Sequence, residues 1–216
     1  MNQKKVRFEI MLITAILIFG FNECFGQAID VVKIGKQEWM ARNLNVSTFR
    51  NGDTIPEVKM GKDWEIAGNE GRPAWCYYKN DLENGQKYGK LYNWYAVNDP
   101  RGIAPIGWHV PTDEEWTRLT DELGGEDIAG TLLKSQKGWK KNGSGTNESG
   151  FNAHPAGGRY SDGTFSSLKE YTYWWSSTET DPDLAWYRYT GYEDALAPRY
   201  YYDKRTGFSI RCLKDN

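Results

Sequence analysis

The stretch from Pro105 to Leu123 constrains the fold most, because it carries the strongest helix signal in the chain. Thr112 and Glu115 have the spacing of a capping box, in which each side chain accepts a hydrogen bond from the other residue's backbone. Gly124 then supplies a residue that tolerates the left-handed conformation in which helices end. The apolar residues that recur at helical spacing are Trp116, Leu119 and Leu123. We therefore predict a helix over residues 113–123 that packs one apolar face on a core.

The N-terminus has the pattern of a secretory signal peptide. The basic residues Lys4, Lys5 and Arg7 precede an apolar run over 10–21 that is short for a membrane span. Cleavage after Gly26 would leave a domain over 27–216. Cys24 raises the alternative of lipidation, but Glu23 occupies a position where a lipidation motif needs a small residue. We predict an exported protein that is extracellular, periplasmic or associated with the cell surface.

Composition narrows the class of partner. The formal net charge is only -2, and no basic patch favours nucleic acid. After the signal peptide no second apolar run is long enough to predict a transmembrane span. The chain has 10 Trp, 14 Tyr, 8 Phe and 23 Gly, which predicts a loop-rich domain with large rings in its core. Nothing in the sequence indicates its oligomeric state.

The remaining pattern predicts an α+β fold with an antiparallel sheet, because helices cluster in the middle and short strands at both ends. The first segments, 31–34 and 37–41, have the spacing of a β-hairpin. Residues 42–74 are predicted as mostly loop, 81–85 as a turn, and 91–97 and 128–134 as short helices. The other predicted strands are 75–78, 151–155, 157–160, 171–176, 185–189, 199–203 and 208–213.

Several motifs in order resemble the Fibrobacter succinogenes major paralogous domain, a family of exported proteins in Bacteroidetes and Fibrobacteres. The resemblance covers residues 31–214 and rests on WCYYKND, YGKLYNWYAV, GWHVPTDEEW, GTNESGFNAHPAGGRYSDGTF, YWWSST and GFSIRC. It implies a C-type-lectin-like fold, with an irregular antiparallel sheet, two helices, long loops and the termini brought together in the sheet. It also implies that no enzymatic activity is generally established. A more distant similarity is to the formylglycine-generating, sulfatase-modifying enzymes.

Cys76 and Cys212 are the cysteines left after signal removal, and an exported compartment permits a disulfide between them. Two buried free thiols are the alternative. The similarity to the sulfatase-modifying enzymes would instead make them a copper-binding pair in an oxidase, since soft thiolates select Cu(I). The local cysteine motif of those enzymes is not present here.

Other polar residues are interpreted as structural. His109 and His154 lie at no ligand spacing from each other, and helix capping already explains Asp113, Glu114 and Glu115. The oxygens of 146–149 (Thr-Asn-Glu-Ser) are too few for a calcium site, and the usual calcium-dependent lectin motifs are absent. The glycines and arginine of 157–160 and the 161–163 segment are predicted as strand and turn, not as a phosphate loop. No metal or cofactor is predicted.

The densest aromatic region supplies the predicted binding surface. Neighbouring residues of a strand point to opposite faces, so each pair of adjacent rings should leave one ring outside. The candidates are Trp174, Trp175, Trp186, Tyr187, Tyr189, Tyr200, Tyr201 and Tyr202. We predict a non-enzymatic binding or scaffold module that recognises glycan or polysaccharide through these rings. The alternatives are a copper-dependent oxidase and a surface component that binds another protein.

Overall fold

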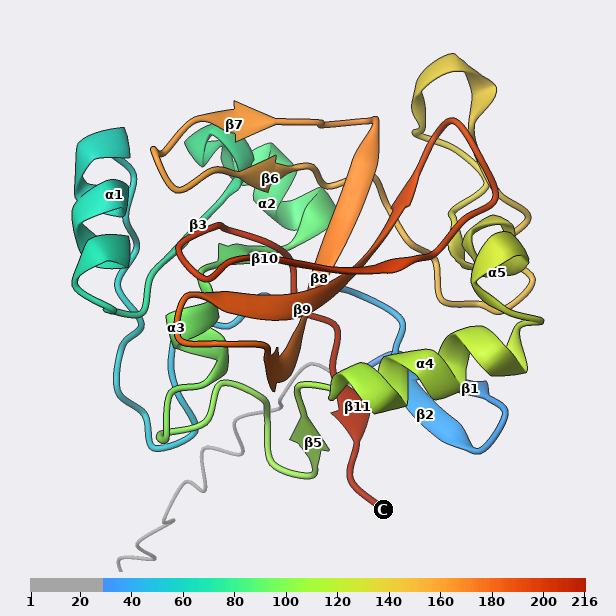
Figure 1. Ribbon diagram of the computed structural model, residues 1–216, viewed down its shortest axis with the longest axis horizontal. Coiled ribbons are helices and arrows are strands. Elements are labelled where there is room, and N and C mark those ends of the chain that lie inside the picture. Colours follow the sequence, from blue (N-terminus) through green and yellow to red (C-terminus); the bar gives the residue numbers. More distant parts are fainter. Residues whose placement is uncertain (1–28) are drawn as a thin grey trace, which may run out of the picture.

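The computed structural model describes residues 29–216. The predicted signal peptide, its cleavage point and the Cys24 alternative lie outside these residues. Figure 1 shows a central twisted sheet, with helices and smaller strand pairs arranged around it. All the paired strands are antiparallel, so the structure confirms an α+β architecture with several small antiparallel sheets.

The strongest sequence signal is confirmed. Helix α4 runs from Asp113 to Glu122, and its capping box is complete. The Thr112 hydroxyl accepts from the Glu115 backbone N–H at 3.2 Å, and Glu115 Oε2 accepts from the Thr112 N–H at 2.9 Å. Helix α5, Glu126–Leu133, follows after two glycines and lies within two residues of its predicted limits.

The two ends of the described chain meet in one sheet. Its strands are β1 (Val31–Ile34), β2 (Gln37–Met40), β5 (Trp108–His109) and β11 (Leu213–Lys214), in the order β1-β2-β11-β5. The predicted hairpin is confirmed, with Gly35 at φ +57° in its turn. Leu213 pairs with Trp39 on one side and His109 on the other, which ties the C-terminus to both neighbours.

The central sheet has the order β10-β9-β8. Its strands are β8 (Tyr171–Glu179), β9 (Leu184–Gly191) and β10 (Arg199–Asp203). Two short hairpins complete the sheets: β3 (Trp75–Cys76) pairs with β4 (Leu91–Tyr92), and β6 (Gly158–Arg159) pairs with β7 (Phe165–Ser166).

Five α-helices occur within residues 29–216, more than the two that the family resemblance implies. Helix α1 (Gly61–Asn69) lies in the predicted loop, and α2 (Leu82–Tyr88) replaces the predicted turn. Helix α3 (Trp94–Val97) and two 3₁₀ turns (Tyr78–Asn80 and Lys140–Asn142) complete the set. Both missed helices are short and rich in polar residues, so tertiary contacts stabilise them more than an apolar repeat does.

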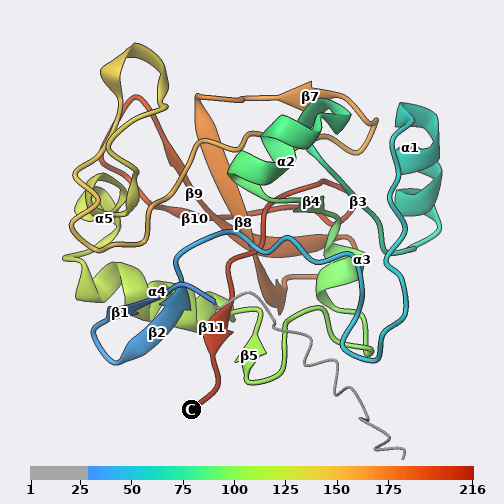
Figure 2. The same cartoon turned by 180° about the vertical axis from the view of Figure 1, so that it is seen from behind.

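Two predicted strands do not form as expected. Residues 151–155 make only a single bridge at Ala153, and the predicted strand 208–213 is reduced to β11. Instead, the backbone of 208–210 bonds to three different segments: Phe208 to Tyr92, Ser209 to Tyr173 and Trp175, and Ile210 to Leu44. This stretch therefore crosses the core as a connector between sheets. Figure 2 shows it from behind, next to the segment that follows β2.

Candidate binding surface

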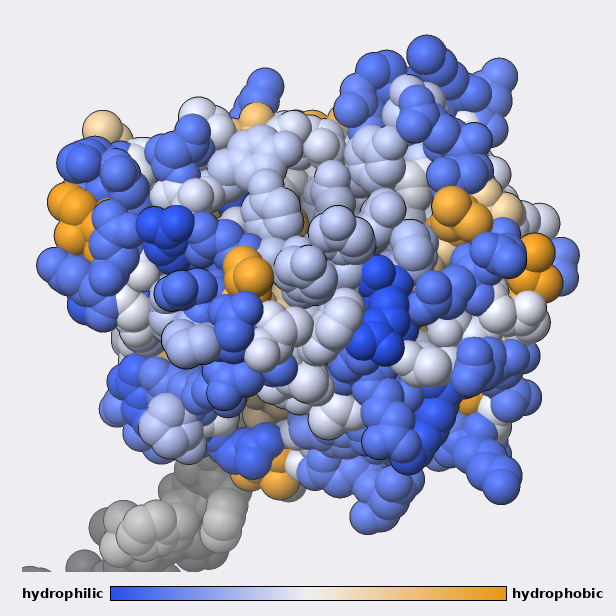
Figure 3. Space-filling view, viewed as in Figure 1, coloured by the Kyte–Doolittle hydropathy of each residue, from blue (hydrophilic) through white to orange (hydrophobic). Residues whose placement is uncertain are grey.

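The two faces of the central sheet carry different side chains. Tyr173 is directly opposite Tyr189, and Tyr187 is directly opposite Tyr200, so these rings share one face. Six tyrosines of the sheet lie on this side, five of them exposed or half-buried and one, Tyr187, buried. We call them the tyrosine face: Tyr171, Tyr173, Tyr187, Tyr189, Tyr200 and Tyr202. Figure 3 shows the region as pale surface of intermediate hydropathy, bordered by more hydrophilic residues.

The rings of the tyrosine face support one another. Tyr173 lies 6.1 Å from Tyr189 and 6.0 Å from Tyr187 between ring centroids, and Tyr187 lies 6.2 Å from Tyr202. Phe208 is buried in the segment that bridges to β8 at Trp174, and its ring stacks on Tyr173 at 4.7 Å on the same side of the sheet. These distances lie in the range in which aromatic pairs attract each other. Neighbouring rings on the same face therefore hold one another in place.

A small pocket opens where this face meets the β6–β7 hairpin. It encloses about 100 Å³, and the aromatic residues that line it are Tyr160, Tyr173, Tyr187, Tyr202 and Phe208. Ser166, Ser167 and Thr206 add hydroxyl groups to its wall. Thr206 is fully buried, and its Oγ1 has no hydrogen-bond partner within residues 29–216. A buried hydroxyl without a partner is uncommon in proteins and is suited to a ligand's polar group.

The hydroxyls of Tyr171, Tyr173 and Tyr187 stay protonated at neutral pH. Burial, reinforced by neighbouring tyrosines, raises the pKa of Tyr187 well above its ordinary value. Burial likewise raises the pKa of Tyr173 to about 12. Tyr171 reaches about 12 through burial and then its hydrogen bond to Glu193. Each hydroxyl can therefore donate as well as accept a hydrogen bond.

Glu193 braces one end of the face. Its carboxylate accepts from the hydroxyl of Tyr171 at 2.9 Å and from that of Tyr192 at 2.7 Å. These two hydrogen bonds lower the pKa of Glu193, because they stabilise its charged form. The carboxylate thus fixes two rings at the end of the sheet.

Two of the predicted surface rings are wrong. Trp174 and Trp175 are both fully buried, because both faces of β8 are covered at these two residues. Trp174 packs 5.7 Å from Trp116 of α4, and its indole N–H donates to Asn43 at 3.0 Å. Trp175 points to the same side of β8 as Tyr173 and is covered there by Phe208, 4.7 Å away. Where both faces of a strand are covered, as at these two residues, alternation alone does not expose a ring.

The other predicted rings divide between the faces. Tyr187, Tyr189, Tyr200 and Tyr202 belong to the tyrosine face, although Tyr187 is largely buried within it. Trp186 and Tyr201 lie on the opposite side, with ring centroids 5.5 Å apart. Sequence reasoning missed Tyr160, Tyr171 and Tyr173. The alternation of 171, 173 and 175 in one strand is the signal that could have identified the last two.

Of the two alternatives for Cys76 and Cys212, the disulfide is wrong and the pair of buried free thiols is confirmed. Cys76 packs with Trp64 and Leu91, whereas Cys212 lies in the main core cluster. Burial raises the pKa of the Cys76 thiol to about 11 and that of Cys212 to about 12. Because the thiolate is the form that binds copper, these protonated, buried thiols give the oxidase alternative no support.

Local contacts account for His109, but they leave a nitrogen of His154 unpartnered. His109 lies 2.7 Å from Asp215 through Nδ1 and 3.1 Å from Glu115 through Nε2, so it links the C-terminus to the start of α4. His154 Nδ1 is buried and has no partner among the described residues. The structural hydrogen bond expected for His154 is therefore missing at that nitrogen. Within residues 29–216, no three His, Cys, Asp or Glu side chains are grouped to hold a metal ion.

The remaining polar loops are local turns. In the 146–149 loop, Asn147 Oδ1 accepts from the Asn152 N–H at 2.7 Å, and the Thr146 hydroxyl accepts from the Glu148 N–H. These oxygens are already used within the loop. The predicted strand and turn at 157–163 are confirmed as the β6–β7 hairpin, with Asp162 accepting two hydrogen bonds from Thr164 in its turn.

The acidic residues of α4 have structural partners. Asp113 lies 3.3 Å from Arg199 and 3.9 Å from the buried Arg188, and Glu114 pairs with Arg118 one turn later. Glu115 completes the capping box. These contacts agree with the structural interpretation of the acidic cluster.

The fold and the ring-lined face define a mixed α+β protein with several small antiparallel sheets and an aromatic surface. The chain belongs to the Fibrobacter succinogenes major domain family, whose model matches residues 32–214. No curated protein and no solved structure matches the chain. Among the residues described, no helix combines the length and the apolar character needed to cross a membrane.

Proposed function

We propose that this protein is an exported, non-enzymatic module that binds glycan or polysaccharide through the tyrosine face. The observation that carries the proposal is the pocket beside that face, which tyrosine rings line together with Thr206, a buried residue whose hydroxyl has no partner within residues 29–216. Binding sites commonly combine aromatic walls with a few polar groups that fix orientation.

The chemistry of the face suits a sugar. The apolar side of a pyranose ring packs on an aromatic ring, and protonated tyrosine hydroxyls donate to its ring substituents. The pocket of about 100 Å³ is smaller than the roughly 300–1,000 Å³ that encloses a drug-sized ligand. We infer that one substituent or one ring edge of the sugar enters the pocket. The rest of the glycan then lies across Tyr187, Tyr189 and Tyr200.

We also propose a C-type-lectin-like fold for the chain. The shared sheet of β1, β2, β5 and β11, which brings both ends of the described chain together, supports it. Long connections between the short strands support it as well. Export rests on the N-terminal sequence pattern and on the family.

The test uses two adjacent residues of β10. Tyr202 lines the pocket, and Tyr201 points to the other side of the same strand with similar exposure. Glycan arrays and polysaccharide pull-downs with the wild-type protein identify a ligand, and titration then compares the variants. We expect Tyr202→Ala to weaken binding about tenfold, and Tyr201→Ala to change it less than about twofold.

If the wild-type protein binds no glycan or polysaccharide, the proposed function is rejected. Equal loss in both variants would show that the face is not the site. A protein partner is the alternative occupant, because tyrosine is also enriched in protein interfaces. Co-purification of a partner that Tyr202→Ala releases, without any sugar, would favour that alternative.

A further inference from the structure

A second concavity lies away from the tyrosine face. It is a cleft of about 940 Å³ between α2 and the segment that follows β2. Figure 2 shows both of these segments on the back of the molecule. The charged residues and the histidine of its wall are Asp30, Arg42, Lys87, His154 and Arg211. Three of these are cationic side chains and one is an acid, although burial lowers the pKa of Arg211 to about 9.

Arg211 is the most unusual of them, because it is fully buried and has no acid partner within residues 29–216. Its guanidinium donates to the backbone carbonyls of Met40 and Phe151, at 3.0 and 2.6 Å, and to Asn43 Oδ1. No carboxylate among residues 29–216 forms an ion pair with it. Burying a charge costs free energy unless an opposite charge compensates it. The wall of the cleft thus holds a positive charge that only neutral groups balance.

His154 is a second residue of the cleft with an unsatisfied polar atom. Its Nδ1 is buried without a partner among the described residues, and its ring lies 6.5 Å from that of Tyr88. Lys87, the residue before Tyr88, holds its ammonium group 4.9 Å from the centre of that ring. The histidine and the lysine therefore flank the same aromatic wall.

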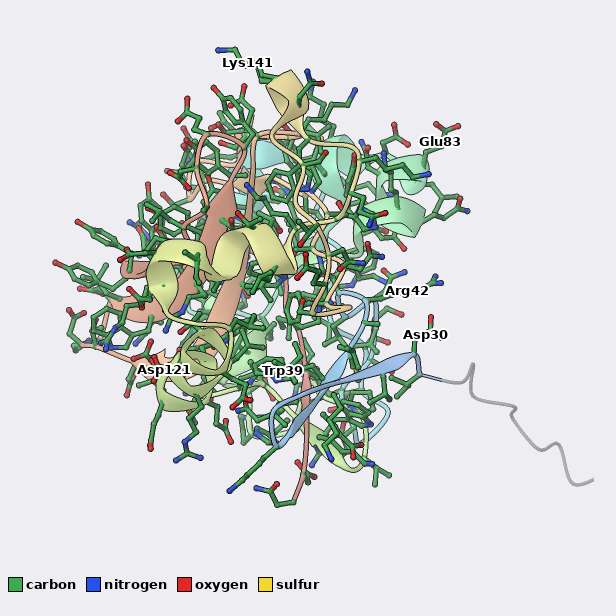
Figure 4. The ribbon with its side chains drawn as sticks, turned by 90° about the vertical axis from the view of Figure 1, so that its right-hand side faces the viewer. Asp30, Trp39, Arg42, Glu83, Asp121 and Lys141 are labelled. Carbon is green, nitrogen blue, oxygen red and sulfur yellow. The ribbon has the colours of Figure 1, made fainter. Side chains whose placement is uncertain are left out.

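Arg42 stands at the open side of the cleft. It is exposed and forms an ion pair with Asp30 at 3.0 Å, the one acid of the wall. Figure 4 shows Arg42 and Asp30 on the opposite side of the molecule from the β8–β10 sheet, with Lys141 at a distant end. Exposed ion pairs contribute little to stability, so Arg42 can turn to a ligand at small cost.

We propose that this cleft is a binding site for an oxyanion, a carboxylate, sulfate or phosphate group, held by Arg42, Lys87 and His154 in front of the buried Arg211. The proposal does not depend on the function of the tyrosine face. An anion would supply the counter-charge that Arg211 lacks and accept the hydrogen bond that a protonated His154 can donate.

The positive surroundings also predict a pH dependence. Burial first, and then the charges of Arg211, Lys87, Arg42 and Lys137, lower the pKa of His154 below its ordinary value. Asp30 is the only acid of the cleft wall that opposes them. A bound anion cancels part of this repulsion, so binding should take up a proton and should tighten as pH falls.

The experiment titrates the purified protein with inorganic phosphate and, separately, with glucuronate, and follows backbone amide signals by NMR. We expect shifts confined to 85–89, 152–154 and the segment after β2. Lys87→Gln and Arg42→Gln should each weaken binding about tenfold, whereas Lys141→Gln at the distant end should leave it unchanged. Binding of phosphate alone, or of glucuronate alone, supports the site and identifies the class of anion.

His154→Gln separates the role of the histidine from that of the fixed charges. Its binding should no longer tighten as pH falls, while a weaker, pH-independent affinity remains. Calorimetry in buffers of different ionisation enthalpy should show proton uptake in the wild type and not in this variant. No shifts with either anion would overturn the proposal. So would equal weakening by Lys141→Gln, because that result would indicate only the general field of the protein.

Discussion

The two faces of the central sheet differ in burial, although the same alternation of side chains along the strands produces both. On one face Trp174, Arg188 and Thr190 are fully buried against α4 and α5. The other face carries Trp175 and Tyr187, which Phe208 covers at the core, and beside them the more exposed Tyr171, Tyr173 and Tyr189. The difference shows that the second layer of the fold, and not the strand sequence, decides which rings become available to a ligand.

The two faces of the sheet also differ in their charged residues. Arg188 is fully buried on the covered face, where it pairs with Glu126 and donates to the Thr117 hydroxyl at 3.0 Å. Its other acid neighbour, Asp113, is 3.9 Å away. The tyrosine face, by contrast, consists of six side chains that are neutral in their protonated form. Polar contacts therefore join the sheet to the helices, whereas the open face offers rings and hydroxyl groups.

The largest predicted effect tests the covered face. Trp174→Ala removes a fully buried indole that touches Trp116 and Phe151. We expect the free energy of unfolding to fall by about 3–5 kcal/mol, as for other buried aromatic truncations. Chemical denaturation measures it. A loss of less than about 1 kcal/mol would contradict the packing described for this face.

Alkaline pH tests the protection of the tyrosine face. The hydroxyl of Tyr173 has a raised folded-state pKa of about 12, whereas an unfolded tyrosine titrates near 10. Between these values the folded chain keeps a proton that the unfolded chain has lost. This contribution is complete below about pH 10, and it declines by up to about 1.4 kcal/mol per pH unit as pH rises to about 12. Tyr173→Phe should flatten the decline, as measured by denaturation at several pH values. An unchanged slope would contradict the burial of this hydroxyl.

A smaller effect of opposite sign is expected at Thr172. This residue is fully buried opposite Thr190 on the covered face, and neither hydroxyl has a partner within the described chain. Thr172→Val keeps the shape and removes the unmet polar group, so it should stabilise the protein by about 1 kcal/mol. A denaturation midpoint that falls instead would indicate a hydrogen bond to this hydroxyl, for example through water.

The smallest effect is expected at Tyr200, which is 56% exposed. Tyr200→Ala should change the free energy of unfolding by less than about 0.5 kcal/mol, because the ring is open to solvent. The contrast with Trp174→Ala in the same denaturation assay measures the asymmetry of the two faces directly. A loss close to that of Trp174→Ala would mean that the open face is part of the core.

Local signals predicted the parts of the fold that local contacts stabilise. The capping box placed α4, the two-residue turn placed β1 and β2, and β10 occupies its predicted range of 199–203. Helices α1 and α2 were not predicted, because neither has a strong apolar repeat. Asp81 does cap α2 by accepting from the Glu83 N–H at 2.8 Å, a signal that could have indicated a helix there.

The candidate sites were predicted less well than the fold. The sequence indicated which strands carry the aromatic residues. However, the prediction placed the buried Trp174 and Trp175 at the surface and omitted Tyr171 and Tyr173. Nothing in the sequence indicated the cleft around Arg211, because its residues come from positions as far apart as Asp30, Lys87, His154 and Arg211 itself. Sites assembled from such distant segments depend on how the chain packs.

By itself, the sequence determined the family, the mixed architecture and the strands that carry the aromatic residues, because periodicity, caps and turns act between near neighbours in the chain. Only the tertiary structure decided which rings face outward, why the two thiols stay apart, and where an unpaired cation is buried. Those outcomes depend on burial, and burial is set by segments that meet only when the whole chain has packed.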